Sequence, residues 1–171
     1  MKKLGLFFVV FSVLVLGIGL VGAYTYTCPD DQTILRLYDI TNSHASTFSS
    51  IGYVKQICYN ELFNVDYSGV NAGANVHNCN ANNVVLNLSD ITNAHAERTN
   101  YGNYPVGVCY GDLVCSVKAT CAVNEVEVVS LSDLTNAHLA AYGAGASAYA
   151  NKVCCSSVSG GPTCNNNNIQ E

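Results

Sequence analysis

Residues 129–138 read VSLSDLTNAH, and two related stretches precede them, LRLYDITNSH at 35–44 and LNLSDITNAH at 86–95. Apolar and polar residues alternate over the first four positions of each stretch, which is the period of a half-buried β-strand. The same Asp-(Ile/Leu)-Thr-Asn-x-His motif then follows. The chain therefore contains three copies of one motif, and we expect three copies of one local structure.

Each copy lies between two cysteines and carries a tyrosine five residues before the second cysteine. The three cysteine brackets are Cys28 and Cys58, Cys79 and Cys109, and Cys121 and Cys154. We predict a mainly β fold made of three tandem small units stapled by disulfides. Each unit is expected to be a strand, a turn or short helix, and a return strand. One hairpin of this size is only marginally stable in water, so we expect the three units to stack.

These unit boundaries divide the remaining chain into a leader, two connectors and a tail. Residues 1–23 combine two lysines, an apolar run and a small-residue end, which is typical of a signal peptide, with an uncleaved membrane anchor as the alternative. Either one exports the rest of the chain to where disulfides form. The predicted segments are unit one at 24–59, a connector at 60–78, unit two at 79–110, a connector at 111–120, unit three at 121–155 and a tail at 156–171. The apolar residues of the first connector predict an extra strand or hairpin.

The nine cysteines cannot all pair within one chain. Position in the repeat favours Cys28–Cys58, Cys79–Cys109 and Cys121–Cys154, and each such loop of about 30 residues stabilises the fold by roughly 3–4 kcal/mol when closed. The other three cysteines allow Cys155–Cys164, which we favour and which leaves Cys115, or the rival Cys115–Cys164, which leaves Cys155.

The motif residues have a structural interpretation and a metal-binding one. We expect the Asp and Thr side chains to cap the turn, and the His to bond a backbone carbonyl or pack on the tyrosine. Repetition favours this structural role, because a residue needed to fold a unit recurs in every copy. The motif residues in question are Asp39, Thr41, Asn42, His44, Asp90, Thr92, Asn93, His95, Asp133, Thr135, Asn136 and His138. A metal site formed by His44, His95 and His138 would require the units to surround an axis, whereas a linear stack holds these residues apart.

Composition excludes some classes of function. The formal net charge is −5, and only five basic residues follow the leader, so nucleic-acid binding is not expected. No nucleophile, zinc-protease, phosphate-loop or EF-hand motif is found in the sequence, so we expect neither an enzyme nor a cofactor. Asn87-Leu88-Ser89 forms an N-glycosylation sequon on the polar face of its strand.

The stretches TNAHA at 92–96 and YANKVCC at 149–155 resemble a short cysteine-bracketed repeat of predicted secreted archaeal proteins of unknown function. The resemblance covers most of the chain from Cys28 to Cys155 and implies an extracellular or cell-surface location. It brings no catalytic role, and unit two departs from the Lys-Val-Cys ending with Gly107-Val108-Cys109.

We therefore expect a secreted or cell-surface structural or adhesive protein, with an extracellular filament subunit as one form. Self-association or other surface proteins are the expected partners, and the membrane is contacted only through an uncleaved leader. The alternatives are a carbohydrate-binding module and a metal-binding protein that uses repeated Asp/His pairs.

Overall fold

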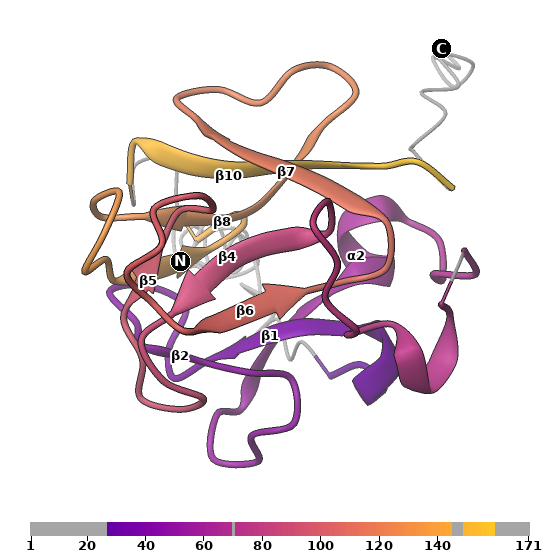
Figure 1. Cartoon of the computed structure of the whole chain (residues 1–171), viewed down its shortest axis with the longest axis horizontal. Coiled ribbons are helices and arrows are strands. Elements are labelled where there is room, and N and C mark those ends of the chain that lie inside the picture. Colours follow the sequence, from indigo (N-terminus) through magenta and orange to yellow (C-terminus); the bar gives the residue numbers. More distant parts are fainter. Residues whose placement is uncertain (1–26, 70, 145–148, 160–171) are drawn as a thin grey trace, which may run out of the picture.

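The computed structural model describes residues 27–69, 71–144 and 149–159 (Figure 1). The predicted leader, the tail from residue 160 and Cys164 lie outside the described residues. The described chain is mainly β, as predicted, with three small antiparallel sheets. Among the helices of the described residues, none has the length and apolar character of a membrane-spanning segment.

The three sheets share one strand order, in which the strand that leads into the motif lies between the other two. In the first sheet β1 (Thr33–Leu37) lies between β2 (Ala45–Ser46) and β3 (Lys55–Cys58). In the second, β4 (Val84–Leu88) lies between β5 (Ala96–Glu97) and β6 (Val106–Cys109). In the third, β8 (Val126–Leu131) lies between β9 (Leu139–Ala141) and β10 (Asn151–Ser157), and β7 (Leu113–Lys118) is added beside β10. Each motif copy thus belongs to its own sheet.

The first connector forms a helix, so the predicted extra strand or hairpin is wrong. The connector contains α2 (Tyr59–Phe63), which begins one residue before it, and the short helix η2 (Gly73–Asn75). Another short helix, η1 (Asp30–Gln32), precedes β1. Tyr59 and Phe63 are four residues apart, and the helix brings their rings together at a centroid distance of 4.4 Å. Both rings are buried, and Tyr59 also packs against Tyr67 and Tyr110.

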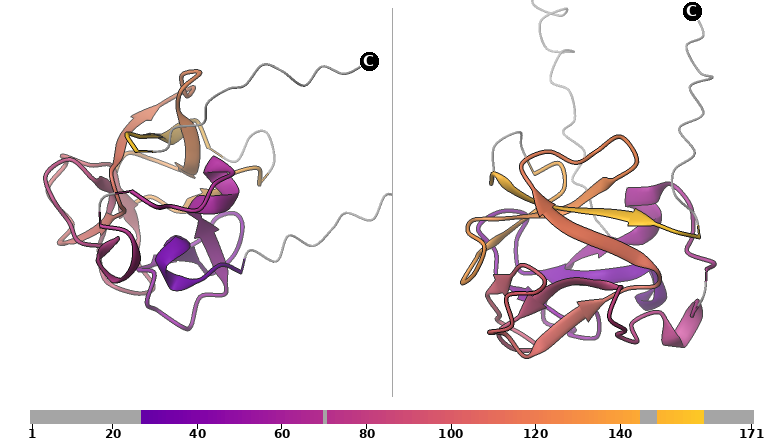
Figure 2. Two further views of the ribbon diagram at one scale, coloured as in Figure 1. Left: turned by 90° about the vertical axis from the view of Figure 1, so that its right-hand side faces the viewer. Right: turned by 45° about the horizontal axis from the view of Figure 1, so that its top comes forward.

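Backbone hydrogen bonds join the three sheets into a closed ring. Short antiparallel bridges link Ser43 to Leu139, Ala45 to Ala94, and Ala96 to Ala137. Each bridge carries two N–H···O bonds of 2.8–3.0 Å. The first motif segment thus contacts the second, the second the third, and the third the first. The views in Figures 1 and 2 show the sheets around a common interior rather than in a row, so the units surround an axis and do not form a linear stack.

The same ring explains why no helix follows the motif in the described residues. Three stretches of chain surround the motif histidines. Among them, Ala137 to Tyr142 is the most compatible with a helix, yet it contains strand β9. The N–H groups that a helix would use internally instead bond to neighbouring segments, as in Ala137 to Ala96 and Ala141 to Ile40, both at 2.9 Å. Tertiary pairing therefore overrides the local helix propensity of alanine.

The predicted alternation is confirmed in the first two motif strands and is wrong in the third, where Ser130 is as buried as Val129 and Leu131. Leu35 and Leu37 are fully buried, while Arg36 is half-buried and Tyr38 is exposed. Leu86 and Leu88 are also fully buried. The leucines of the three sheets meet in one core, and each copy supplies only a part of it. No single copy could bury these side chains alone.

Four disulfides stabilise this core. Three of them are the repeat-bracketing pairs, Cys28–Cys58, Cys79–Cys109 and Cys121–Cys154. The fourth joins Cys115 to Cys155, so the favoured pairing Cys155–Cys164 and its rival Cys115–Cys164 are both wrong. The reason is strand β7, which the sequence pattern did not predict: it pairs with β10 so that Cys115 lies directly opposite Cys155.

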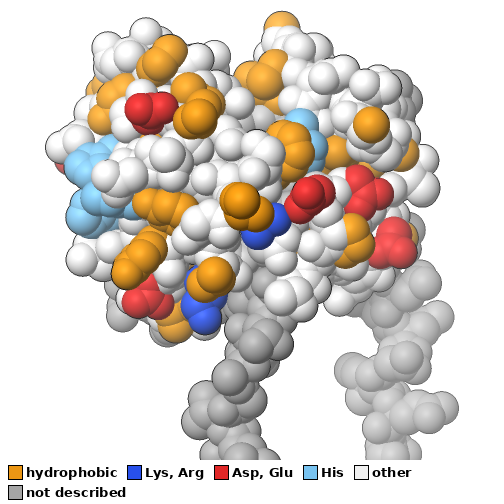
Figure 3. Space-filling model, turned by 90° about the horizontal axis from the view of Figure 1, so that it is seen from below, with side chains coloured by type: hydrophobic (Ala, Val, Ile, Leu, Met, Phe, Trp, Pro, Cys, Tyr) orange, Lys and Arg blue, Asp and Glu red, His pale blue; other side chains and the backbone are white. Residues whose placement is uncertain are grey.

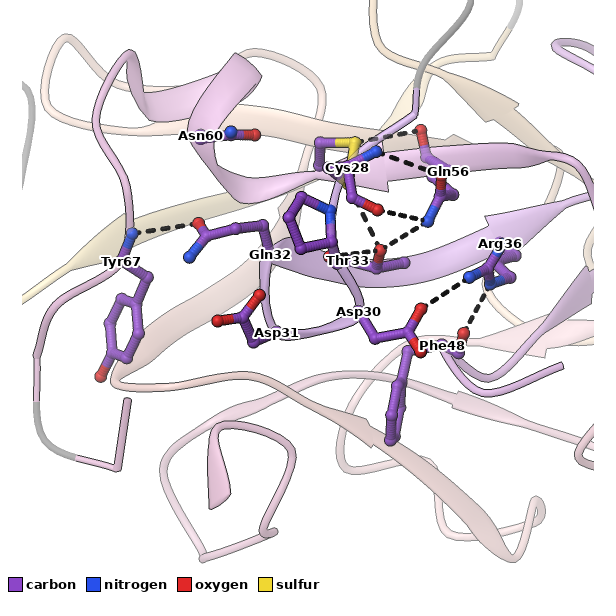
Figure 4. The surroundings of a disulfide bond; sticks show 12 residues. Cys28, Asp30, Asp31, Gln32, Thr33, Arg36, Phe48, Gln56, Asn60 and Tyr67 are labelled. Atoms are coloured by element: carbon purple, nitrogen blue, oxygen red, sulfur yellow. Dashed lines mark hydrogen bonds and ion pairs between the residues drawn. A yellow bond between two sulfur atoms is a disulfide. The ribbon is translucent and has the colours of Figure 1, made fainter. Parts of the chain in front are cut away.

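The first disulfide lies in a polar network (Figure 4). The Gln56 side chain donates to the Cys28 carbonyl and to Thr33 Oγ1, both at 2.9 Å, and accepts from the Cys28 N–H at 3.2 Å. Arg36 donates through Nε to the Phe48 carbonyl at 2.5 Å and pairs with Asp30 at 2.9 Å. These bonds satisfy the polar groups of Cys28, Thr33 and Gln56 beside the disulfide.

We predict that Glu97→Ala destabilises the fold by about 2–4 kcal/mol, because Glu97 is fully buried and accepts hydrogen bonds from the N–H groups of Asn103 and Tyr104 at 2.9 and 2.8 Å. Urea unfolding followed by circular dichroism measures the loss. Glu61→Ala, at an exposed carboxylate on α2, is the matched control and should change stability little. Equal losses in the two variants would contradict the importance of the buried carboxylate.

We predict that non-reducing peptide mapping links Cys115 to Cys155 and finds no link between Cys155 and Cys164. The double variant Cys115→Ser/Cys155→Ser should lose about 2–5 kcal/mol of stability. A Cys155–Cys164 peptide in the oxidised protein would show that the pairing of β7 with β10 is incorrect.

Candidate metal centre

The three motif histidines converge on one point of the surface. One ring nitrogen from each of His44, His95 and His138 lies within 4.8 Å of the other two. The ring centroids are 4.7, 4.9 and 4.9 Å apart, which is close to an equilateral triangle. Because the backbone ring places the three motif copies around an axis, residues from three distant parts of the chain meet there. We call these three residues the His triad.

Alternation along the short bridging segments directs the triad outward. In the second copy the residues on either side of His95, Ala94 and Ala96, have no exposed surface. Their side chains face the core, so the His95 side chain points to the opposite, solvent-facing side. The same holds in the other copies, and each triad histidine is partly exposed. Figure 3 shows pale-blue histidine side chains gathered on one flank of the molecule.

Each triad histidine is held by an asparagine from another motif copy. His44 Nδ1 lies 2.7 Å from Asn93 Oδ1, and His138 Nδ1 lies 2.6 Å from Asn42 Oδ1. His95 Nδ1 bonds Asn136 Oδ1 in the same way. The bonds therefore go to asparagine side chains rather than to the backbone carbonyls expected from the sequence.

The asparagine backbones adopt a left-handed conformation, with φ of 47°, 49° and 49° at Asn42, Asn93 and Asn136. Asparagine is one of the few residues besides glycine that tolerates this region. The repeated turn therefore does two things with one residue, since asparagine both permits the positive φ and supplies the oxygen that binds a histidine. The sequence pattern indicated a structural role for this residue and gave no sign of its contact with histidine.

These contacts determine which ring nitrogen carries the proton. A side-chain amide oxygen only accepts hydrogen bonds, so each Nδ1 must donate. The same oxygens also accept from tyrosine hydroxyls, Asn93 Oδ1 from Tyr53 at 3.4 Å and Asn42 Oδ1 from Tyr149 at 3.3 Å. With Nδ1 protonated, a neutral imidazole presents the lone pair of Nε2. The Nε2 atom of each ring is then free of a proton and able to bind a cation.

The distance between two of these nitrogens favours a cation at the centre. His44 Nε2 and His95 Nε2 are 2.9 Å apart. Two nitrogen lone pairs that face each other at that distance repel each other. A proton or a metal ion between them removes the repulsion. A Zn²⁺ ion bound tetrahedrally, with Zn–N distances of about 2.0–2.1 Å, holds its nitrogens about 3.3 Å apart. The His44–His95 pair is closer than that spacing, and the three ligand nitrogens lie within 4.8 Å of one another, so the rings must shift to bind the ion.

Burial lowers the pKa of His138 below the ordinary imidazole value, and the neighbouring His44 and His95 lower it further. The ring therefore stays neutral to lower pH than an exposed histidine does. Neutral imidazole is the form that binds metals.

The motif aspartates do not join the triad. Asp39, Asp90 and Asp133 each accept the N–H of the following residue at 2.6–2.7 Å, so they bond within the turn, but one residue on rather than the two or three residues on that a cap would reach. The only group of three or more candidate metal ligands in the described residues consists of the three histidines, and no motif aspartate belongs to it. Thr41 and Thr92 are exposed, and Thr135 donates to Glu97 at 3.5 Å.

Asn87, the residue of the sequon, lies half-buried on β4. It lines an open cleft of about 770 Å³ together with several other asparagines, among them Asn80, Asn82 and Asn100. The fourth histidine, His77, stacks on Phe48 and is not part of the triad.

Comparison of the chain with protein-family models, curated proteins and solved structures finds no match in any of the three. The geometry of the triad is therefore the main indication of function.

We predict that Asn93→Gly weakens metal binding by about 10–100-fold, because it removes the oxygen that orients His44 while glycine keeps the positive φ. Isothermal titration with Zn²⁺ measures the affinity. Asn93→Asp retains both the acceptor oxygen and the tolerance of the turn, so it should bind at least as well as the original chain. Equal weakening by both substitutions would show that asparagine acts only on the turn.

Proposed function

We propose that this is an extracellular protein that binds one divalent transition-metal ion at the His triad. The observation that carries the proposal is the convergence of three imidazoles whose Nδ1 atoms are all occupied by asparagine oxygens. Three neutral nitrogen ligands suit Zn²⁺, Cu²⁺ or Ni²⁺ better than Ca²⁺ or Mg²⁺, which require oxygen. The proposal assigns no catalytic reaction to the protein.

The four disulfides are consistent with an oxidising environment outside the cytoplasm. The proposed location is the extracellular space or the cell surface, and the expected leader and the resemblance to secreted archaeal repeats support it. In that environment a site built from histidine has an advantage over one built from free cysteine, because imidazole is not lost to disulfide formation.

We predict that protein produced without a histidine tag binds one Zn²⁺ per chain in equilibrium dialysis, as measured by elemental analysis. Replacement of any triad residue, as in His44→Ala, His95→Ala or His138→Ala, should lower the affinity by more than about 100-fold, beyond the range of changes to outer-shell partners. The physical reason is that two imidazoles cannot hold the ion alone.

His77→Gln is the matched control, because it removes the one histidine outside the triad and should leave zinc binding unchanged. Circular dichroism of each variant establishes that the fold is retained. Failure of the original chain to bind zinc, or an equal loss in His77→Gln, would overturn the proposal.

A structural or adhesive surface role, including that of a filament subunit, is the second candidate function. It is favoured by exposed apolar side chains, of which Ile51, Val123 and Tyr38 are 93%, 90% and 69% exposed. With few charged residues to oppose association, such side chains favour contact with other copies or other surface proteins. Electron microscopy of native material tests it, and a monodisperse monomer at high concentration would count against it.

Carbohydrate binding is the third candidate, and the asparagine-lined cleft beside β4 is the observation that favours it. Amide side chains both donate and accept, which suits neutral hydroxyl groups. A glycan on Asn87 would occupy the same cleft, so a glycan-binding screen should use protein whose Asn87 is shown by mass spectrometry to be unmodified.

A further inference from the structure

The His triad supplies three ligands, while the preferred coordination number of Zn²⁺ and Co²⁺ in nitrogen sites is at least four. No Cys, Asp or Glu of the described residues lies within reach to complete the set. If the triad binds a metal ion as proposed above, at least one coordination position is therefore left to a group from outside this set.

The open position faces solvent. Below the triad, the backbone bridges between Ala45 and Ala94 and between Ala96 and Ala137 close the core side with small, fully buried residues. The imidazoles project from the other side of these segments and are partly exposed. A ligand can thus approach the metal only from the solvent face.

Charge determines which ligand is favoured there. Three neutral imidazoles leave the full +2 charge of the ion uncompensated. The carboxylates of the motif do not belong to the metal-ligand group. They accept hydrogen bonds from backbone N–H groups of their own turns, at Asp39, Asp90 and Asp133. An anionic ligand at the open position gains more electrostatic free energy than a neutral one.

Apolar residues belong to the same turns. Ile40 and Ile91 follow the motif aspartates and are 40% and 59% exposed. Their backbone carbonyls accept N–H bonds from Ala141 and Thr47, which ties these turns to the ring around the triad. The motif turns at 39–44, 90–95 and 133–138 contain no Lys or Arg. They therefore add no cationic side chain that would compete with the metal for the anion.

We propose that the metal bound by the His triad keeps an exchangeable position that takes a small anion, such as a carboxylate or an inorganic monoanion. The anion binds directly to the metal, in place of water, from the solvent face. The centre is then a receptor for small anions as well as for the ion itself.

Cobalt substitution tests this with a direct readout. Full-length protein is loaded with Co²⁺, one ion per chain is verified by elemental analysis, and azide is titrated while the visible absorption of the metal is recorded. The expected result is a saturable shift of the visible band with one azide per cobalt. Perchlorate at matched ionic strength, which coordinates metals weakly, should leave the band unchanged.

The outcomes separate the two proposals. If the chain takes up no cobalt, the metal-binding function fails. If cobalt binds in one-to-one ratio and azide leaves its spectrum unchanged, metal binding stands and the exchangeable position is overturned, since another group of the protein or a second copy then fills it. Cobalt-loaded His77→Gln should respond to azide as the original chain does, and loss of the response there would also overturn the inference.

Discussion

The ring of backbone bridges that joins Ser43 to Leu139, Ala45 to Ala94 and Ala96 to Ala137 is the constraint on which the structure depends. Each bridge uses main-chain groups that lie next to a motif histidine. Small side chains at most of these positions allow the segments to approach closely around the axis. The ring closes the common core on one side and presents the three imidazoles on the other.

Disulfides and the ring act at different levels. The bracketing disulfides fasten the segment before each motif strand to its return strand, so they stabilise the sheets one at a time. The bridges and the shared leucine core hold the sheets to one another. Cys115–Cys155 adds β7 to the third sheet and so covers an edge that the other two sheets leave without a fourth strand.

The asparagine of the motif connects fold to function. Its left-handed backbone belongs to the turn, while its side chain fixes the histidine of a different copy. A mutation there would disturb two sheets at once. This also explains why three copies of a structural motif can produce one site: each copy orients the ligand of another, so the centre exists only when the ring is closed.

The repeated strands, the bracketing cysteine pairs and the turn at each motif could all be predicted from the sequence, because alternation, spacing and turn chemistry are local properties. The cysteine count also showed that not all nine could pair, but not that Cys115 meets Cys155, since that contact depends on β7 lying beside β10. Where the sequence allowed a turn or short helix, Ala137 to Tyr142 contains strand β9 for a similar reason, because propensity does not include bonds to distant segments. Tertiary packing alone decided whether the copies form a row or a ring, and with it whether the histidines are separate or together, because a repeat specifies each unit and leaves the relation between units to the packing of their shared core.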